Sequence, residues 1–211
     1  MLGVMNFDGA GNASGSYTAQ FAGGPPHVLT TTGTFTGTYT TNPDGTGSVT
    51  TTLDAGITFT FATVTTDSGN GMQLVATSCS GNGCDLSGTL LSGFARAAEA
   101  GGSPNGNYGF QFTIAPNVNS TIGVASFDGA GNITLSESFI SPGQGQAPVM
   151  TAPSQTGTQA GTYTTNSDGS GKISFSPQEY AFVMVDGGSA MLVLQLHRSG
   201  DGIQFGVARL Q

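Results

Sequence analysis

Apolar and polar residues alternate in short runs along much of this chain, and turn-forming Gly, Asp and Asn residues separate the runs. In the run 57–64, for example, Ile57, Phe59 and Phe61 fall on one side and the intervening threonines fall on the other. A period of two is typical of a β-strand, and threonines opposite aromatic residues indicate a sheet with one face on a core and one face in water. The pattern therefore predicts strands rather than helices.

The second half of the chain predicts eight such strands joined by short connections. Asp-Gly pairs at Asp128, Asp168, Asp186 and Asp201 separate most of them and supply the positive φ that tight hairpins need. One longer connection, rich in Gly, Pro and Gln, is expected at 141–160. The predicted strands are 107–115, 121–127, 132–140, 161–166, 171–175, 180–186, 190–198 and 203–210.

Two segments of the chain occur twice in the same order. Residues 3–12 return at 123–132 with eight of ten positions identical, and residues 37–47 return at 161–171. The offsets of 120 and 124 residues are nearly constant, and they far exceed the period of solenoid repeats, which is about 20–50 residues. We interpret this as a tandem duplication of one domain. The predicted domains are 1–101 and 102–211.

The predicted fold class is all-β: two tandem antiparallel up-and-down β-barrels of about eight strands. Eight neighbouring strands tend to close into a barrel because closure removes both unpaired edges. Segment 3–12 matches the second strand of the second domain, so nothing in the chain matches that domain's first strand, 107–115. The first barrel is therefore expected to have seven strands. Its missing strand lies upstream in the natural chain or comes from a neighbouring chain.

Composition excludes several classes of function. The chain has four Lys and Arg residues against twelve Asp and Glu residues, a net charge of −8. Nucleic-acid binding needs clusters of basic residues, which are absent here. No apolar run approaches the roughly 20 residues that cross a bilayer as a helix. We expect no nucleic-acid partner and no membrane insertion.

The two cysteines are Cys79 and Cys84, with Ser-Gly-Asn-Gly between them. Cysteines flanking such a turn are typical of a disulfide that closes the end of a hairpin, and disulfides persist in oxidising compartments. A metal site would need two further ligands nearby, and the neighbouring sequence holds no other His or Cys. We expect a disulfide and a secreted, cell-surface or periplasmic protein, whose signal peptide is absent from this chain and has been removed.

Two charged residues of the second domain share a strand face with apolar residues. Alternation places Glu137 on the face of Leu135 and Arg209 on the face of Phe205. An inward charge needs a partner because burying it alone is costly. One hypothesis is that Glu137, with Arg209, contacts a ligand or acts as a general base. The alternative is that Arg209 and its counterpart Arg96 plug the barrel ends while Glu137 pairs locally; the recurrence of Arg, but not of Glu, favours it.

The remaining motifs indicate little chemistry. His197 lies near a strand end without the Gly-x-Ser-x-Gly turn that would hold an activated serine, and His27 lies in a Pro-rich loop. The loops at Asp8 and Asp44 space their Asp and Asn oxygens as calcium loops do, but they lack the bidentate Glu. Hairpin turns account for them. We expect no cofactor and no metal. Enzymatic activity stays open, with a non-catalytic role favoured and Glu137 as the candidate catalytic residue.

An eight-strand meander with Arg209 in its last strand resembles the calycin barrels, the lipocalin-like group. The resemblance implies that Arg209 packs across an aromatic residue of the first strand, Tyr108 or Phe110. It concerns architecture alone, since the lipocalin Gly-x-Trp motif is absent from a chain without Trp. The segments Phe-Asp-Gly-Ala-Gly-Asn and Gly-Thr-Tyr-Thr-Thr-Asn-x-Asp-Gly are similar to repeats in uncharacterised exported bacterial proteins. An inward Glu137 also resembles allene-oxide-cyclase-like barrels.

Together these observations predict a secreted, non-catalytic β-barrel that serves as a binding or structural module of the bacterial cell exterior. Three alternatives stay open. One is a lipocalin-like carrier of a small apolar ligand; another is a surface protein that self-assembles by strand donation at the open β edge of the first domain; the third is a cyclase or isomerase that uses Glu137. The carrier's expected ligand-binding residues are Phe110, Leu135, Phe182 and Leu194 as lining, with Glu137 or Arg209 as the polar contact.

Overall fold

The computed structural model describes residues 1–22, 28–81, 84, 92–98, 101–115, 119–140, 155–197 and 203–211. Their regular structure consists of antiparallel strands and one short 3-10 turn, Asp67–Gly69, so the predicted all-β fold class is confirmed. The chain consists of two compact units. The units are Gly3–Thr18 with Thr32–Ala97, and Ala98–Gln211 with Met1–Leu2 and Ala19–Thr31. The domain limits 1–101 and 102–211 stay a prediction.

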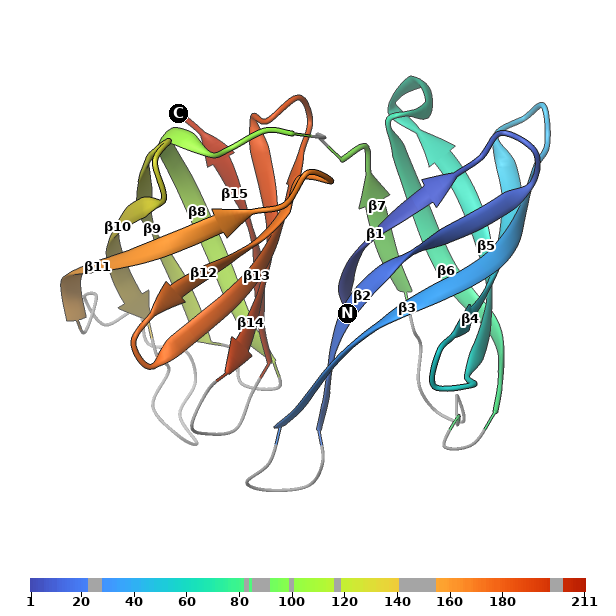
Figure 1. Cartoon of the computed structure of the whole chain (residues 1–211), viewed down its shortest axis with the longest axis horizontal. Coiled ribbons are helices and arrows are strands. Elements are labelled where there is room, and N and C mark those ends of the chain that lie inside the picture. The colour runs from blue at the N-terminus through green and yellow to red at the C-terminus, as the bar shows by residue number, and fades with distance from the viewer. Residues whose placement is uncertain are drawn as a thin grey trace. The chain divides into compact units, whose positions relative to one another are not determined.

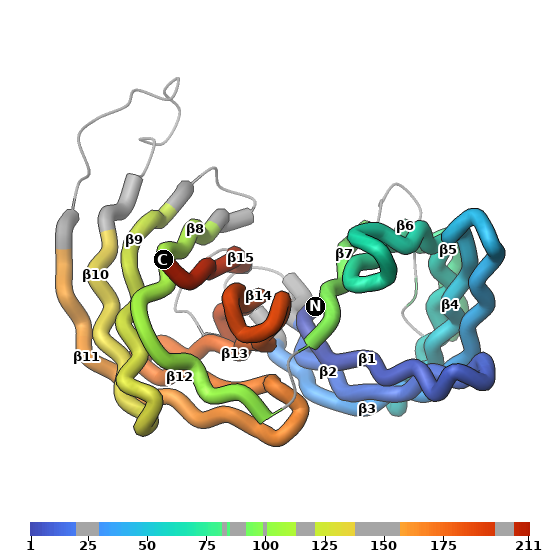
Figure 2. Tube along the Cα trace, turned by 90° about the horizontal axis from the view of Figure 1, so that it is seen from above, coloured from blue at the N-terminus to red at the C-terminus, as the bar shows by residue number. Residues whose placement is uncertain are grey.

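The first seven strands form one sheet, here called the open sheet, in the order of the sequence (Figure 1). Figure 2 shows their traces curving round in succession from β1 to β7. The two edge strands are β1 and β7, and no described strand joins one to the other. The prediction of a seven-stranded first sheet with an open edge is therefore confirmed. The strands are β1 (Leu2–Phe7), β2 (Asn12–Ala22), β3 (Val28–Thr41), β4 (Thr46–Leu53), β5 (Thr58–Thr66), β6 (Gly71–Ser80) and β7 (Ser92–Arg96).

The next eight strands form a closed antiparallel barrel, here called the barrel, as the meander pattern predicts. Closure comes from β8, which pairs with β9 on one side and with β15 on the other. Each of the eight predicted strands is present. They are β8 (Asn105–Ala115), β9 (Asn119–Asp128), β10 (Asn132–Ile140), β11 (Gln155–Thr165), β12 (Ser170–Phe175), β13 (Gln178–Val185), β14 (Ala190–His197) and β15 (Ile203–Leu210).

One boundary differs from the sequence prediction. The connection expected at 141–160 ends earlier, because β11 begins at Gln155. The extra residues pair with most of β10, from Phe139 opposite Gln155 to Thr134 opposite Ala160. The Gly, Gln and Thr residues of this stretch give little strand signal of their own, so its conformation depends on the long neighbouring strand.

The core of the barrel consists of side chains that alternate inward from every strand. Aromatic rings fill much of it: Tyr108 packs edge-on against Phe127 with ring centres 5.4 Å apart, and Phe127 packs in the same way against Tyr163 at 5.1 Å. Phe182 is completely buried. Residues of the described core cluster are Tyr108, Phe110, Phe112, Ala125, Phe127, Ile133, Leu135, Tyr163, Ile173, Phe175, Tyr180, Phe182, Met184, Met191, Val193 and Ala208.

Glycines on the inner face make room for these rings. A Cβ atom at Gly123 would lie 2.7 Å from the ring of Phe110, and one at Gly206 would lie 2.2 Å from the ring of Phe112. Each glycine lies directly opposite an aromatic residue of the neighbouring strand: Phe110 pairs with Gly123, and Phe112 pairs with Gly206. Large and small residues thus face each other across the ladder, which fills the interior without strain.

Candidate functional site

The candidate site is the open edge, the position between β1 and β7 where the barrel has β8. Matching sequence segments identify the corresponding strands: Gly3–Asn12 corresponds to 123–132, so β1 corresponds to β9. The shared Gly-x-Ala-Arg of β7 and β15 relates 93–96 to 206–209 in the same way. In the barrel, β9 and β15 are the two partners of β8. The described residues of the open sheet include no strand at this place.

Phe7 shows the consequence of the open edge most directly. It corresponds to Phe127, and each contacts a Tyr at matching positions: Phe7 lies 4.7 Å from Tyr39, and Phe127 lies 5.1 Å from Tyr163. Phe127 is 4% exposed because Tyr108 of β8 also covers it, whereas Phe7 is 40% exposed. The difference lies in the ring that β8 supplies to the barrel and that the described open sheet lacks.

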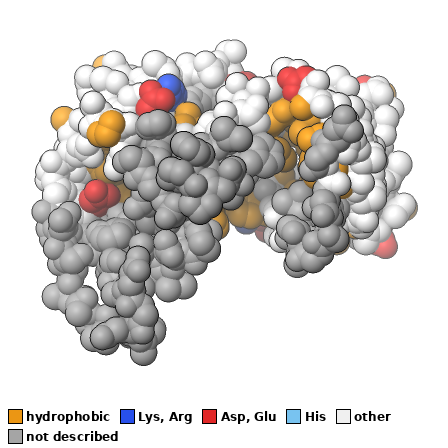
Figure 3. Space-filling view, turned by 90° about the horizontal axis from the view of Figure 1, so that it is seen from below, with side chains coloured by type: hydrophobic (Ala, Val, Ile, Leu, Met, Phe, Trp, Pro, Cys, Tyr) orange, Lys and Arg blue, Asp and Glu red, His pale blue; other side chains and the backbone are white. Residues whose placement is uncertain are grey.

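Two small residues of β7 show the same difference. Gly206 in the barrel lies against the backbone and ring of β8, while a Cβ atom at the corresponding Gly93 would meet nothing within 4 Å. Ala208 is buried beside β8, and the corresponding Ala95 is only half-buried. Figure 3 shows hydrophobic side chains gathered on the inner side of the unit on its right. Gly93 and Ala95 therefore lack the cover that β8 gives to their counterparts in the barrel.

Arg96 and Arg209 occupy corresponding positions and make corresponding contacts. Arg209 lies 3.9 Å from Asp186 at the turn between β13 and β14, and Arg96 forms an ion pair with Asp67 at the turn between β5 and β6. Each pair has one exposed and one partly buried member, and pairs near the surface contribute little, about 0–1 kcal/mol. Each pair ties the end of the last strand of its unit to a neighbouring turn.

The expectation that Arg209 points into the barrel is wrong. Its side chain is 65% exposed, and its neighbour Ala208 faces inward, opposite Phe110. Since Tyr108 and Phe110 both belong to the inner core, the contact with Arg209 that the calycin resemblance implied is also absent. The physical reason is that β15 is apolar on both faces, so alternation alone does not say which face is inside. The rings of β8 leave room only for Gly and Ala there.

The predicted ligand-lining residues divide between the two faces. Phe110 and Leu135 border a small cavity at the centre of the barrel, and Phe182 is buried in the core beside it. The placement of Leu194 in the lining is wrong, because the inward residues of β14 are Met191 and Val193, and alternation turns Leu194 to the opposite face.

The cavity has a volume of about 20 Å³ and is bordered by twelve side chains of the core. A water molecule needs about 10–15 Å³, whereas a pocket for a small-molecule ligand measures about 300–1,000 Å³. The described interior therefore has room for about one water molecule, and a carrier role would require these side chains to move apart.

Glu137 lies on the inner face of β10, as predicted. Its neighbours across the ladder are Gly157 on β11 and Gly123 on β9, neither of which has a side chain. The carboxyl group is half-buried, and this burial raises the pKa of Glu137 above its ordinary value. Among the ion pairs of the described residues, none involves Glu137.

The open sheet has Tyr17 where the barrel has Glu137. The hydroxyl of Tyr17 donates a hydrogen bond to Asp54 at 3.0 Å, and the backbone NH of Thr34 donates to the other oxygen of that carboxylate at 2.9 Å. These hydrogen bonds, that from Thr34 first, lower the pKa of Asp54. The position thus carries a local polar contact in one unit and a carboxyl group in the other.

Sequence reasoning did not single out Gln195. It is 2% exposed and lies on the inner face of β14, where its amide NH₂ is 3.5 Å from the hydroxyl of Tyr180. Its carbonyl oxygen has no hydrogen-bond partner among the described residues. The signal was available, because Gln195 continues the inward series of Met191 and Val193. The side chain of His197, and His27 as a whole, lie outside the described residues.

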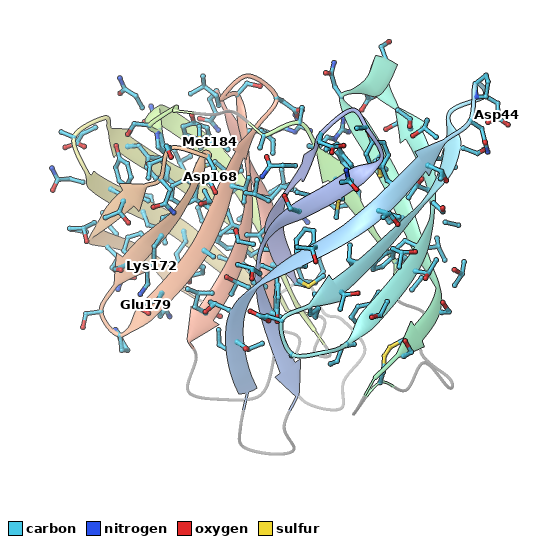
Figure 4. All side chains as sticks on the ribbon, turned by 45° about the vertical axis from the view of Figure 1, so that its right-hand side comes forward. Asp44, Asp168, Lys172, Glu179 and Met184 are labelled. Carbon is cyan, nitrogen blue, oxygen red and sulfur yellow. A yellow bond between two sulfur atoms is a disulfide. The ribbon has the colours of Figure 1, made fainter. Side chains whose placement is uncertain are left out.

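The Asp-Gly loops bind their own backbone. Asp8 accepts hydrogen bonds from the backbone of Ala10 and from both the backbone and the side chain of Asn12, and Asp128 repeats this arrangement. The hydrogen bond from the Asn side chain comes first among the causes that lower the pKa of both carboxyl groups. Figure 4 labels Asp44 and Asp168, which bind the backbone of their turns similarly. No group of three possible metal ligands occurs in the described part of the chain.

Cys79 and Cys84 form a disulfide, as predicted, with Cα atoms 6.0 Å apart. The bond ties the end of β6 to the connection that leads toward β7. No described helix is both long and apolar enough to cross a bilayer. No protein-family model, curated protein or solved structure matches this chain.

Proposed function

We propose that this protein is a non-catalytic binding module that takes up a partner's β-strand at the open edge. The observation that carries the proposal is the contrast between Phe7 and Phe127: the same local sequence is buried where β8 is present and 40% exposed where it is not. Strand addition at a sheet edge combines backbone hydrogen bonds, which give affinity, with side-chain pockets, which give specificity. The unpaired edges of β1 and β7 support the first part of this mode, and the exposed ring of Phe7 supports the second.

We further propose a place at the bacterial cell exterior and an origin by tandem duplication. The disulfide between Cys79 and Cys84 supports an oxidising compartment,. The matching segments and the corresponding Arg–Asp pairs support duplication. In such a duplicated protein, the barrel serves as the complete domain and the open sheet as the domain that binds.

Native mass spectrometry of the protein purified from its own host, without denaturation, tests this function. We expect a mass increase of a bound polypeptide, lost under conditions that separate strands. A reproducible addition of a few hundred daltons instead would identify a small-molecule carrier and contradict the proposal. A single species that stays unbound under all conditions, with full amide exchange at β1 and β7, would also count against it.

A further inference from the structure

We infer that the partner strand carries aromatic side chains at three alternate positions, in the pattern Tyr-x-Phe-x-Phe, and runs antiparallel to both β1 and β7. This inference rests on the proposed function and names the chemistry of the partner. The pattern is that of Tyr108, Phe110 and Phe112 in β8, the strand that fills the corresponding place in the barrel.

The first position requires a ring that covers Phe7. In the barrel, Tyr108 covers Phe127, and its hydroxyl donates a hydrogen bond to the carbonyl of Gly188 at 2.8 Å. Gly188 lies two residues after Asp186, and in the open sheet Gly69 lies two residues after Asp67. Because Asp186 and Asp67 make corresponding ion pairs, the turn of the open sheet places a carbonyl for the same hydroxyl. This favours Tyr over Phe at the first position.

The second and third positions face glycines. Phe110 lies over Gly123 and Phe112 over Gly206, each closer than a Cβ atom would allow. At Gly3, which corresponds to Gly123, the atoms nearest to a Cβ atom belong to the backbone of β2 and not to a ring, and at Gly93 a Cβ atom meets nothing within 4 Å. The two glycines therefore leave space that large, flat side chains fill, while smaller residues would leave cavities.

The strand must come from outside the fifteen described strands. Eight of these form the closed barrel, where β8 is paired along both edges. A second copy that donated β8 would open its own barrel and gain no pairing in total. The open sheet does not fill the place itself, because each of its seven strands already has its own position in the sheet. We therefore assign the open edge to a further strand of this aromatic pattern, from outside these fifteen strands.

The test uses the whole chain and two synthetic peptides. One has the sequence of residues 105–115, Asn-Gly-Asn-Tyr-Gly-Phe-Gln-Phe-Thr-Ile-Ala; in the other, Ser replaces the Tyr and both Phe residues. Two lysines at each end keep both soluble. Isothermal titration should show one binding site for the first peptide. The second peptide should bind at least about 100-fold more weakly, since buried aromatic anchors dominate such interfaces. Hydrogen exchange should show new protection in β1 and β7.

A matched pair of variants locates the site. Gly93→Val fills the space opposite the third aromatic residue and should abolish peptide binding. The free protein tolerates it, because a Cβ atom there meets nothing within 4 Å and Val suits a strand. Gly157→Val, at an equally open position of the barrel, is the control and should bind the peptide as the unchanged protein does.

Each other outcome decides against the inference in a distinct way. Equal binding of both peptides would overturn the aromatic pattern and leave strand addition intact. Protection in β9 and β15 would show exchange with β8 in the barrel and overturn the assignment to the open edge. Peptide-free dimers lost in Gly93→Val would make a second copy the partner. Absence of binding by either peptide, with β1 and β7 unprotected, would overturn both the inference and the proposed function.

Discussion

Phe127 and Phe7 occupy matching positions in the sequence, yet they stabilise the fold to different degrees. One is buried between two Tyr rings, and the other is covered on one side by a single Tyr. The stabilisation that a side chain gives grows with the apolar area it removes from water. At the scale of the residue, stability is therefore a property of the neighbours and not of the local sequence.

We expect Phe127→Ala to lower the free energy of unfolding by about 3–5 kcal/mol, the usual cost for a buried Phe. Phe7→Ala should cost clearly less, because Phe7 is already 40% exposed and Phe127 only 4%. Urea titrations monitored separately for each unit give both values. Equal losses would show that Phe7 is covered in solution.

The pH dependence of the Asp128 turn has a defined sign. Hydrogen bonds, that from the Asn132 side chain first, lower the pKa of Asp128 in the folded state. The carboxylate therefore stabilises the fold above the pKa of the unfolded chain, about 3.9, and this contribution is lost as the pH falls through the folded value. Asp128→Ala should flatten the fall in melting temperature between about pH 4 and 2. Parallel curves for the variant and the unchanged protein would contradict this.

At the scale of the element, the edges decide what each sheet can do. In the barrel, β8 pairs with the strands on both sides, so no edge is left unpaired. In the described open sheet, β1 and β7 each keep an edge of unpaired backbone groups. Unpaired edges promote association with other strands unless they are protected. In this chain the disulfide joins the end of β6, the strand next to the edge strand β7, to the connection that follows it.

We expect reduction of the disulfide, or replacement of Cys79 and Cys84 by Ser, to lower the stability of the open sheet by about 2 kcal/mol. This is the chain-entropy value for a loop whose cysteines are five residues apart. The barrel should be unaffected. Thermal unfolding with and without reductant measures the effect, and a loss shared by both units would show that they unfold together.

At the scale of the whole molecule, fifteen described strands supply one complete barrel and seven-eighths of another. A copy of residues 105–120 placed before Met1 would supply the missing strand within the chain, since residue 121 corresponds to Met1. Linking the strand gives it an effective concentration in the millimolar range or above. We expect a higher melting temperature for the first unit and loss of binding to the added peptide.

Calorimetry and titration of this extended chain check the prediction. A copy with Ser in place of its Tyr and both Phe residues is the control, and it should stabilise the unit less. If the extended chain melts as the original does and still binds the peptide, then the open edge does not accept β8 in the proposed position.

Much of this arrangement was predictable because strand periodicity and turn chemistry are local. The eight strands of the barrel, the seven of the open sheet and the cysteine pair all follow from runs of a few residues. The inner face of β15 was not predictable, because Phe205, Val207, Gly206 and Ala208 give it an apolar character on both sides. Leu194 was misplaced for the same reason in β14, where leucines alternate with other apolar residues.

The sequence by itself determined that this chain forms β-strands, where they turn and that one strand has no counterpart, because each depends on neighbours along the chain. Only the tertiary structure decided which side chains are inside, because that depends on the rings that adjacent strands contribute. It placed Arg209 in water, filled the centre of the barrel to within about 20 Å³ and left Phe7 40% exposed. The open edge became a candidate binding site through packing, which no single segment of the sequence contains.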